Sequence, residues 1–399
     1  MKKLLQINPV VRENTSTGKI MRALGELAIA NGWESYIAYS GARDGVLPHS
    51  SHLIPVGNKW DLLLHFLATR LFDAHGLASR RATRRFIRQI RELDPDVIHI
   101  HNVHGYFLNY PLLAEYLSTS GKPVVWTVHD CWLFTGHCYH YAAAGCDKWK
   151  TQCEKCPQKG AFPASWLVDR SRKNFRDKKK AFGGIPRLTL VTVSQWMKEE
   201  IAHSFLGDKP CRVIPNGIDL DVFKPSPGGP AGCYYLAVAS IWLPEKGLED
   251  LSALAAFLDS DERLVVVGRL PEGYRFPDGV DTLERTADAR SLARLYTGAT
   301  ALVNPTWQDN YPTVNLEAIA CGTPVVTYRT GGSVESVTPE TGAVVEQGDV
   351  RGLLEALHAI RMQGKESYTG RCRSYALSHF SKDDCFRKYI SLYESLATG

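Results

Sequence analysis

The feature that most constrains the fold is an alternation of short apolar runs, rich in β-branched residues, with longer stretches of helical character. The alternation continues through both halves of the 399-residue chain. Runs that are apolar almost without interruption are typical of strands buried on both faces, as in parallel sheets covered by helices. We predict strands at Leu4–Ile7, Tyr36–Tyr39, Val97–Ile100, Val124–Val128, Leu188–Val193, Tyr234–Ala239, Leu264–Val267, Ala301–Val303 and Pro324–Thr327.

The length and one linker-like segment indicate two domains. A chain of 399 residues is too long for one ordinary core. Residues 225–232 are rich in proline and glycine and continue neither a helix nor a strand, so we predict a linker there. We expect doubly wound α/β domains at 1–224 and 233–379, with a final amphipathic helix over 380–399 that returns to the first domain. Ligands of such domains bind at the carboxyl ends of the strands.

Charge and composition exclude several classes of protein. The balance of 47 Lys+Arg against 42 Asp+Glu gives +5, which is too mild to demand a nucleic-acid partner. No apolar run approaches the length of a transmembrane helix. The first apolar run is broken by Gln6, Asn8 and Pro9, so a first strand is a better interpretation than a signal peptide. We therefore expect a cytoplasmic protein whose ten cysteines are thiols or metal ligands.

The most informative pattern lies in the second half, where a polar loop leads into a short helix. Asp309 lies in the loop, Pro312 falls in the first helical turn, and Gly322 stands where the helix ends. The amides and dipole of a helix N-terminus favour an anionic ligand such as a diphosphate. Glu317, about one turn inside, can accept hydrogen bonds from a ribose diol. An ordinary strand–loop–helix unit with a solvated Asp and Glu explains the spacing equally well.

This segment resembles the E-x7-E signature of family 4 retaining glycosyltransferases, a family that includes bacterial capsule and exopolysaccharide enzymes of the colanic-acid type. Asp309 and Glu317 stand at the two carboxylate positions, although most members carry glutamate at the first. The following run, Ala318–Val326, matches the family's A-x-A-C-G-T-P-V-V, and Gly331–Glu335 matches its G-G-x-x-E. The resemblance implies the GT-B fold, in which two Rossmann-like domains flank a cleft and a C-terminal helix crosses back to the first.

The resemblance also implies the reaction. A sugar would pass with retention from an NDP-sugar, UDP- or GDP-linked, to a glycan or polyprenyl-linked acceptor in surface polysaccharide synthesis, and no catalytic metal is expected. Asp309 would orient the donor sugar, and Glu317 would bind the nucleotide ribose. The residues between them would hold sugar and phosphate: Asn310, Tyr311, Pro312, Thr313 and Val314.

A second segment, from Ser240 to Gly247, resembles the family's G-R-L-x-x-x-K-G. A lysine beside a helix start is a reasonable diphosphate clamp, although a surface lysine before a glycine explains the spacing equally well. The resemblance places Ser240 in the donor site and gives Lys246 the catalytic task of stabilising the departing diphosphate. Ile241 stands where the family's phosphate-binding arginine is expected.

The first half supplies further candidates. His129 ends a predicted strand and matches the family's T-x-H-D, which implies a contact to the donor sugar or the acceptor, whereas an isolated histidine is more often structural. His101, Asn102 and His104 end the preceding strand and are candidate acceptor contacts. Gly18 lies in the loop at residues 14–19, which in the family approaches the diphosphate.

An insertion at residues 136–160 is rich in cysteine. Cys138, Cys146, Cys153 and Cys156 have the spacing C-x7-C-x6-C-x2-C. Zinc takes four N or S ligands, and a closed set of four thiolates is structural rather than catalytic. The alternative is a loop with reduced, buried cysteines, and His137 or His140 are alternative ligands in place of one cysteine. We predict one structural zinc ion.

Residues 70–91 hold seven arginines interleaved with apolar residues. A solvated helix face beside a core face explains this pattern, and so does a basic patch that docks on anionic membrane, where polyprenyl-linked acceptors reside. The second interpretation predicts a peripheral location at the inner face of the plasma membrane. The arginines are Arg70, Arg80, Arg81, Arg84, Arg85, Arg88 and Arg91, and the apolar residues are Leu71, Phe72, Leu77, Phe86, Ile87 and Ile90.

Two other functions are compatible with parts of the sequence. A catalytically inactive homologue acting as a scaffold is the first, and Ile241 is the residue that favours it. A nucleotide-sugar 2-epimerase shares the GT-B fold and is the second. The pairing of Asp309 and Glu317 with the following C-G-T-P-V-V run argues against the epimerase.

Overall fold

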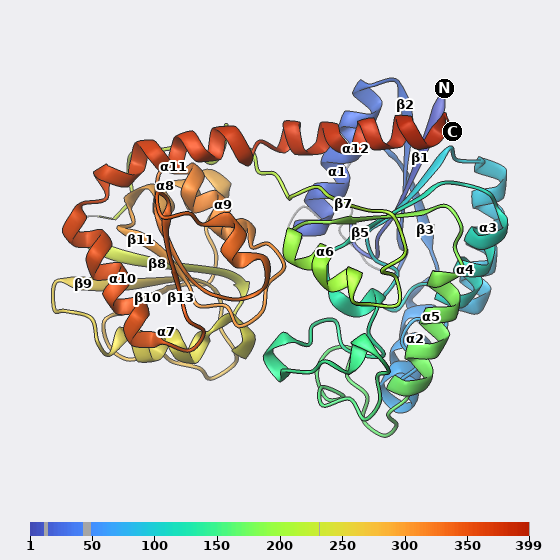
Figure 1. Cartoon of the computed structure of the whole chain (residues 1–399), viewed down its shortest axis with the longest axis horizontal. Helices are drawn as coiled ribbons and strands as arrows, with labels where there is room; N and C mark the ends of the chain where they lie inside the picture. The colour runs from blue at the N-terminus through green and yellow to red at the C-terminus, as the bar shows by residue number, and fades with distance from the viewer. Residues whose placement is uncertain (12–14, 43–48, 231, 399) are drawn as a thin grey trace. The chain divides into compact units, whose positions relative to one another are not determined.

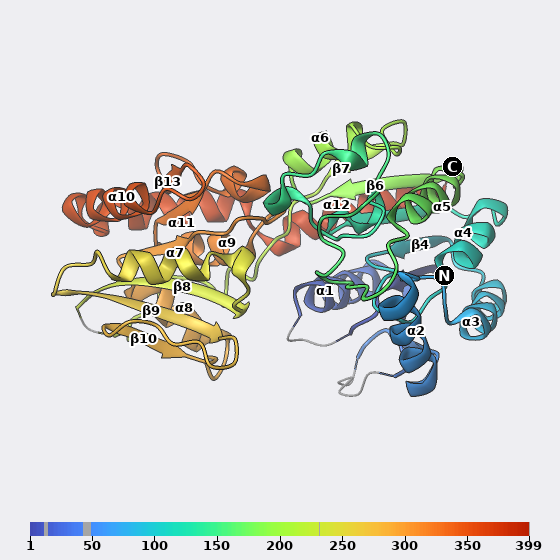
Figure 2. The same cartoon turned by 90° about the horizontal axis from the view of Figure 1, so that it is seen from below.

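The computed structural model describes residues 1–11, 15–42, 49–230 and 232–398 (Figure 1; Figure 2). Asn14, in the predicted first loop, and Ala231, in the predicted linker, lie outside these ranges. The chain divides into two units, which are Met1–Ile214 with Phe386–Gly399, and Pro215–Cys385. Each unit has its own parallel sheet.

The second unit begins at Pro215, whereas the predicted first domain extends to residue 224. The reason is a pairing between distant segments of the second unit. Ile218 forms a parallel bridge with Ser381, and its N–H donates to the carbonyl of Phe380 at 2.8 Å. Gly217 is required beside this bridge, because a Cβ there would lie 2.4 Å from Cα of Lys382. The chain after Ile214 is therefore held by residues of its own unit.

The first unit contains a seven-stranded parallel sheet in the order β3-β2-β1-β4-β5-β6-β7. β1 and β4 are neighbours, although they are distant in sequence, so the strand order reverses between them. Such a reversal is where ligands bind in doubly wound sheets. The strands are β1 (Lys2–Ile7), β2 (Trp33–Ser40), β3 (His52–Val56), β4 (Val97–Ile100), β5 (Val124–Val128), β6 (Leu188–Thr192) and β7 (Cys211–Val213).

Helices cover both faces of this sheet, as alternate residues of β4 reveal. Ile98 and Ile100 lie in a core cluster with Phe86 of α3 and Leu113 of α4. His99 points to the opposite face, where its ring hydrogen-bonds the hydroxyl of Tyr393 of α12 at 2.6 Å. The helices are α1 (Ser16–Ala30), α2 (Lys59–Phe72), α3 (Arg80–Leu93), α4 (Tyr110–Thr119), α5 (Ser171–Gly183) and α6 (Gln195–Ala202), with α12 (Lys382–Ala397) entering from the second unit.

The second unit repeats this plan with a six-stranded parallel sheet in the order β10-β9-β8-β11-β12-β13. Its order reverses between β8 and β11. α7 packs with α10, while α8 and α11 both pack with α9. The strands are β8 (Cys233–Ile241), β9 (Glu262–Arg269), β10 (Val280–Leu283), β11 (Ala301–Asn304), β12 (Val325–Tyr328) and β13 (Gly342–Val345). The helices are α7 (Leu248–Ala255), α8 (Ala289–Gly298), α9 (Thr313–Ala320), α10 (Val350–Gln363) and α11 (Glu366–His379).

The predicted fold class, two Rossmann-like doubly wound units, is confirmed. All nine predicted runs form strands, and the predicted final helix corresponds to α12. Four further strands, β3, β7, β10 and β13, have no predicted counterpart, and each lies at an edge of its sheet.

Candidate active site

Two of the three predicted catalytic residues meet in the second unit. Lys246 follows β8 and Asp309 follows β11, and these neighbouring strands flank the reversal of strand order. Nζ of Lys246 lies 2.6 Å from Oδ2 of Asp309. The two side chains are 32% and 20% exposed, so the pair is within reach of a ligand.

The loops that carry this pair are joined by backbone contacts. Gly247 has a φ of 77°, and a Cβ there would lie 2.1 Å from the carbonyl oxygen of Pro305, so only glycine fits. Trp307 N–H donates to the carbonyl of Glu245 at 2.9 Å. The lysine loop and the aspartate loop therefore form one framework, in which Lys246 and Asp309 keep their spacing.

The start of α9 adds anion-binding groups beside Asp309. The backbone N–H of Tyr311 donates to Oδ1 of Asp309 at 3.2 Å. α9 begins at Thr313 after the N-cap Pro312, whose side chain cannot accept a hydrogen bond from the first turn. The first amides of the helix, at Thr313 and Val314, are therefore suited to an anionic ligand.

Glu317 lies one turn into α9 and is half-buried. Its Oε2 accepts a hydrogen bond from the hydroxyl of Tyr296 of α8 at 3.0 Å. Burial and the charge of Glu317 hold the pKa of Tyr296 well above its usual range, so the phenol stays protonated and donates. The carboxylate is thus fixed in orientation at the side of α8.

The other predicted donor residues of this unit differ in exposure. Asn310 and Tyr311 are buried, whereas Ser240 is exposed at the end of β8.

Ile241 is 43% exposed and pairs in register with Arg269 at the end of β9. Arg269 is itself exposed, and the sequence patterns did not single it out. A positive side chain therefore stands one strand away from the position where the family's arginine is missing.

The first unit brings the remaining predicted side chains together at the ends of β4 and β5. His101, Asn102, His104 and His129 line one pocket, and its wall is completed by Trp126, Val128, Asp130, Trp132 and Leu133. Gly18 is not among the described residues that line this pocket. It lies in the first turn of α1, where its N–H donates to Oγ1 of Thr15 at 3.2 Å.

A hydrogen-bond chain sets the orientation of His129. Nε2 of His101 lies 3.1 Å from Oε1 of Gln6, whose own amide N–H donates to the carbonyl of Met21. Because an amide oxygen can only accept, His101 carries its proton on Nε2, and its Nδ1 accepts from Nε2–H of His129 at 3.1 Å. Burial lowers the pKa of His129 to about 4 and that of His101 well below its usual range. His129 is therefore neutral at pH 7 and suited to hydrogen bonding rather than to carrying charge.

Asp130 is a pocket residue that the predicted site omitted. Its Oδ2 lies 2.8 Å from Nε2 of His104, and the two side chains are 14% and 13% exposed. Burial raises the pKa of Asp130, but the charge and hydrogen bond of His104 and the N–H of Trp132 outweigh it and lower the pKa to about 2. The sequence clue was its place directly after His129 at a strand end.

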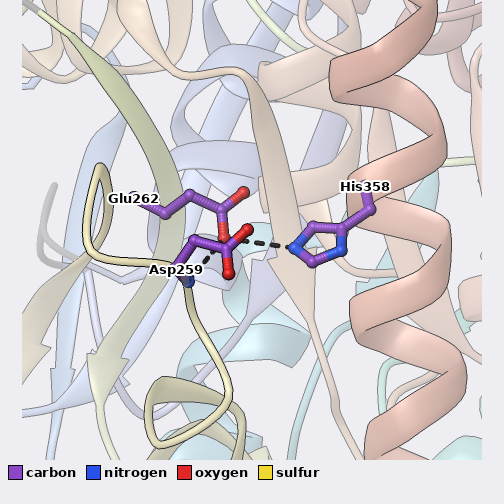
Figure 3. Close-up of side chains that lie close together, drawn as sticks. All are labelled: Asp259, Glu262 and His358. Carbon is purple, nitrogen blue, oxygen red and sulfur yellow. Dashed lines mark hydrogen bonds and ion pairs between the residues drawn. The ribbon is translucent and has the colours of Figure 1, made fainter.

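A compact carboxylate–histidine group lies in the second unit, near the start of β9 (Figure 3). Asp259, Glu262 and His358 form the one described group of three or more potential metal ligands whose atoms all lie within 4.8 Å of one another. Glu262 is the first residue of β9, whereas Lys246 follows the end of β8, so the two lie at opposite ends of these parallel strands. Oε1 of Glu262 lies 2.8 Å from the guanidinium of Arg361 and 2.6 Å from the hydroxyl of Tyr235. A cation already neutralises this carboxylate, so the group is a structural ion-pair network.

The four cysteines of the insertion line a second pocket of the first unit. All four are thiols. In the described part of the chain, no three of their sulfurs lie mutually within 4.8 Å, the spacing at which one ion would bind them all. The structure therefore gathers the predicted ligands without closing them into a coordination shell.

Comparison with known proteins gives matches over both units. The model of Glycosyltransferase Family 4 matches residues 21–222, and that of Glycosyl transferases group 1 matches residues 233–361. The chain is 24% identical over 423 residues to the putative colanic acid biosynthesis glycosyl transferase WcaC of Escherichia coli (strain K12). The alignment covers 98% of this chain and 100% of that protein.

Two solved structures have a similar fold. Sucrose-phosphate synthase from Thermosynechococcus elongatus superposes with a TM-score of 0.73 at 18% identity, over 99% of each chain. Anabaena Alr3699/HepE in complex with UDP-glucose has a TM-score of 0.69 at 14% identity, over 99% of this chain and 100% of that one. At such identities the likeness establishes the GT-B fold alone.

Proposed function

The chain belongs to glycosyltransferase family 4, and from this premise we propose that it transfers a sugar, with retention, from an NDP-sugar to a glycan or lipid-linked acceptor. The observation that carries the proposal is the ion pair of Lys246 and Asp309 beside the start of α9. The name of the Escherichia coli relative supports a place in bacterial surface polysaccharide synthesis.

The donor diphosphate would bind at the start of α9. Negative charge grows on the departing diphosphate in the transition state, and a lysine and helix amides already in place stabilise it without reorganisation. Lys246 would exchange Asp309 for the diphosphate, which frees the Asp309 carboxylate to accept hydrogen bonds from the donor sugar. Glu317 would accept the ribose hydroxyls. The donor would be UDP- or GDP-linked.

The pocket of the first unit would bind the acceptor. His104, held by Asp130, and Asn102 offer polar contacts to a hydroxyl-bearing ligand, and His129 would orient the donor sugar or the acceptor as a neutral group. The family resemblance implies that no metal ion takes part in the transfer. A zinc ion held by Cys138, Cys146, Cys153 and Cys156 forms part of the proposal as a structural element.

Arg269 is our candidate for the cation that Ile241 does not supply. The two residues are paired across β8 and β9, and both are exposed. A long guanidinium side chain at that position can reach a phosphate at the same strand ends.

Incubation with a panel of radiolabelled NDP-sugars tests the proposed reaction. We expect slow hydrolysis of one donor in the absence of acceptor, because water replaces the acceptor at an activated donor. A control with Asp309→Asn should hydrolyse that donor more slowly. No turnover of any donor would indicate an inactive scaffold, and a 2-epimerised sugar product would indicate the epimerase.

The second part of the proposal is a membrane-facing surface, which we assign to other side chains than the apolar residues of the arginine-rich segment. Phe86, Ile87 and Ile90 of α3 are buried in the core, so they belong to no docking surface. The arginines of α3 are exposed at its opposite face. Among the described residues, no helix has both the length and the apolar composition that crossing a bilayer requires.

The exposed apolar side chains lie instead on α2, which buries polar residues and exposes apolar ones, the reverse of an ordinary amphipathic helix. Its fully buried residues are His65 and Thr69. His65 also hydrogen-bonds Ser79 at the start of the arginine-rich α3. We name the exposed set the docking surface: Trp60, Leu63, Leu64, Leu67 and Phe72 of α2.

A second segment extends the docking surface. The N–H of Trp166 donates to the carbonyl of Arg70 at 2.6 Å, and the Arg70 guanidinium lies over the rings of Phe66 and Trp166. Phe162, Leu167 and Val168 are also exposed in this segment, so it joins the docking surface. Exposed tryptophans and leucines beside clustered arginines fit an anionic lipid bilayer.

Sedimentation with phosphatidylglycerol-containing vesicles tests this surface. We expect binding at low salt that weakens at high salt. Leu64→Glu should weaken binding at least about tenfold, because burying one leucine contributes roughly 1.5–3 kcal/mol. Met362→Glu, at an 87% exposed position of the second unit, is the matched control and should bind like wild type. Absence of binding at low salt would contradict the proposal.

A further inference from the structure

The cysteine-lined pocket of the first unit has contacts that a metal ion would complete. Cys138, Cys146, Cys153 and Cys156 all line it, with the buried Trp149 beside them. Cys138 is buried, whereas Cys146, Cys153 and Cys156 are half-buried. The N–H of Gly136 donates to Sγ of Cys153 at 3.3 Å.

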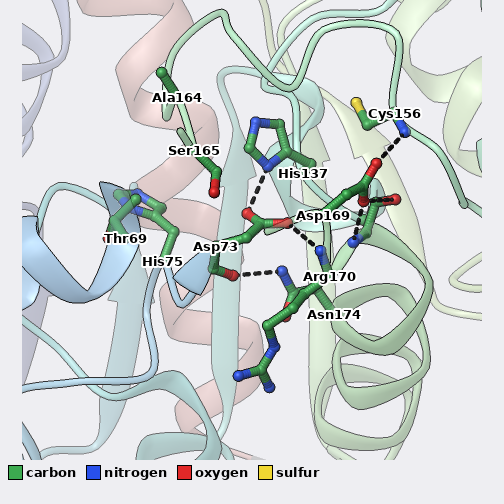
Figure 4. A network of polar contacts seen from close by, with 12 residues as sticks. Thr69, Asp73, His75, His137, Cys156, Ala164, Ser165, Asp169, Arg170 and Asn174 are labelled. Atoms are coloured by element: carbon green, nitrogen blue, oxygen red, sulfur yellow. Dashed lines mark hydrogen bonds and ion pairs between the residues drawn. The ribbon is translucent and has the colours of Figure 1, made fainter. Parts of the chain in front are cut away.

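The segment around these cysteines is long and almost without regular structure. Between η1 (Cys131–Leu133) and α5, the described residues form only the short 3-10 helices η2 (Ala142–Ala144) and η3 (Lys148–Lys150). Segments of this length without helices or strands are uncommon in compact domains. Polar contacts hold its two ends (Figure 4). His137 Nδ1 lies 2.6 Å from the Asp73 carboxylate at the end of α2, and Cys156 N–H donates to Asp169 at 2.7 Å.

Lys178 is a buried cation next to this pocket. It is 1% exposed, and its Nζ donates to the carbonyls of Trp132 at 2.6 Å and Thr135 at 3.0 Å. No carboxylate of the described residues lies within ion-pair distance of it. Thr135 also lines the cysteine pocket, so the ammonium lies beside it. A buried ammonium is costly unless charge or hydrogen bonds compensate it, so negative charge in this pocket would stabilise Lys178.

We propose that the four cysteines bind one zinc ion as a tetrathiolate and that Lys178 is its counter-ion. A zinc ion with four thiolates carries two net negative charges, and the buried ammonium offsets one of them. Tetrahedral binding requires the sulfurs to lie about 3.8 Å apart, given zinc–sulfur bonds of about 2.3 Å. The four sulfurs would therefore draw together around the ion.

The ion would also stiffen the acceptor pocket that the proposed function assigns to this unit. Nζ of Lys178 lies 3.4 Å from the ring centroid of Trp132, and Trp132 in turn lies 5.3 Å from the His104 ring. Lys178 thus connects the cysteine pocket to a wall residue of the pocket that holds His104 and Asp130. Zinc loss would loosen this wall without removing any of its side chains.

Metal analysis of the full chain, purified without chelator, tests the proposal. We expect about one zinc per chain in wild type, and loss of zinc in Cys153→Ser and in Cys156→Ser. Cys211→Ser and Cys233→Ser, at half-buried cysteines outside the pocket, are the matched controls and should retain zinc. His137→Gln should also retain it. Metal-free wild type, or zinc retained in both Cys153→Ser and Cys156→Ser, would overturn the site, and zinc loss in His137→Gln would overturn the four-thiolate ligand set.

The counter-ion is tested by competition for Zn²⁺ with a chromophoric chelator. Lys178→Met should lower zinc affinity by about 10- to 100-fold, the usual effect of removing an outer-shell partner. Lys179→Met, at the exposed neighbouring position, should leave it unchanged. Equal affinities in the two variants would overturn the counter-ion role. If Lys178→Met fails to fold, the absorption of Co²⁺-substituted wild type still reports whether four thiolates bind one ion. Neither readout depends on sugar transfer, so the zinc site and the proposed reaction fail independently.

Discussion

Lys246→Ala is expected to lower kcat for sugar transfer by about 100- to 1,000-fold, the effect of removing one preorganised group that stabilises developing negative charge. The ammonium lies 2.6 Å from Asp309 at the start of α9, where the diphosphate would leave. The pair is partly exposed, and such pairs contribute at most about 1 kcal/mol to folding. The melting temperature should therefore change little.

Steady-state kinetics with the donor found in the panel measures this effect. Lys246→Arg keeps the positive charge and should retain part of the activity, because a guanidinium also binds phosphate. Lys224→Ala, at an exposed lysine of the same unit, is the matched control and should behave like wild type. Wild-type kcat in Lys246→Ala would show that the lysine has no role in catalysis.

Glu317→Gln is expected to weaken binding of the nucleotide donor by roughly 1–3 kcal/mol, the range for hydrogen bonds to a charged group. The carboxylate is half-buried and already oriented by the hydroxyl of Tyr296 at 3.0 Å. Glutamine keeps an oxygen that accepts from Tyr296, so this substitution separates donor binding from folding.

Titration calorimetry with UDP, GDP and the active NDP-sugar measures the change in affinity. Glu340→Gln, at an exposed glutamate of the same unit, serves as the matched control. Unchanged affinity in Glu317→Gln, with an unchanged melting temperature, would remove the ribose-binding role from this residue.

The strands that could be predicted differ from those that could not in their burial. β4 and β5 are buried at every position, so each appears in the sequence as an apolar run. β3, β7, β10 and β13 are the edges of the two sheets, and most of their residues are partly or fully exposed. Edge strands need no continuous apolar run, and without one their sequences look like loops.

The residues of the candidate site also divide into those that the sequence predicts and those that it does not. The residues Asp309, Glu317, Lys246 and His129 followed from local motifs at strand ends. Their partners did not, because each comes from a distant segment: Gln6 orients the His101–His129 pair, and Tyr296 orients Glu317. Asp130 was adjacent in sequence, but its role depends on His104 from another strand.

By itself, the sequence determined the two doubly wound units, the family and the principal polar residues, because these depend on local periodicity and on motifs a few residues long. Only the tertiary structure decided which faces of the helices are buried. α2 is apolar around most of its circumference, and its sequence does not predict that His65 and Thr69 face the interior while Trp60 and Leu64 face solvent. The same holds for Lys178, whose burial beside the cysteine pocket arises from the packing of α5. Burial and partner choice depend on which distant elements meet, and that is set by the whole fold rather than by neighbouring residues.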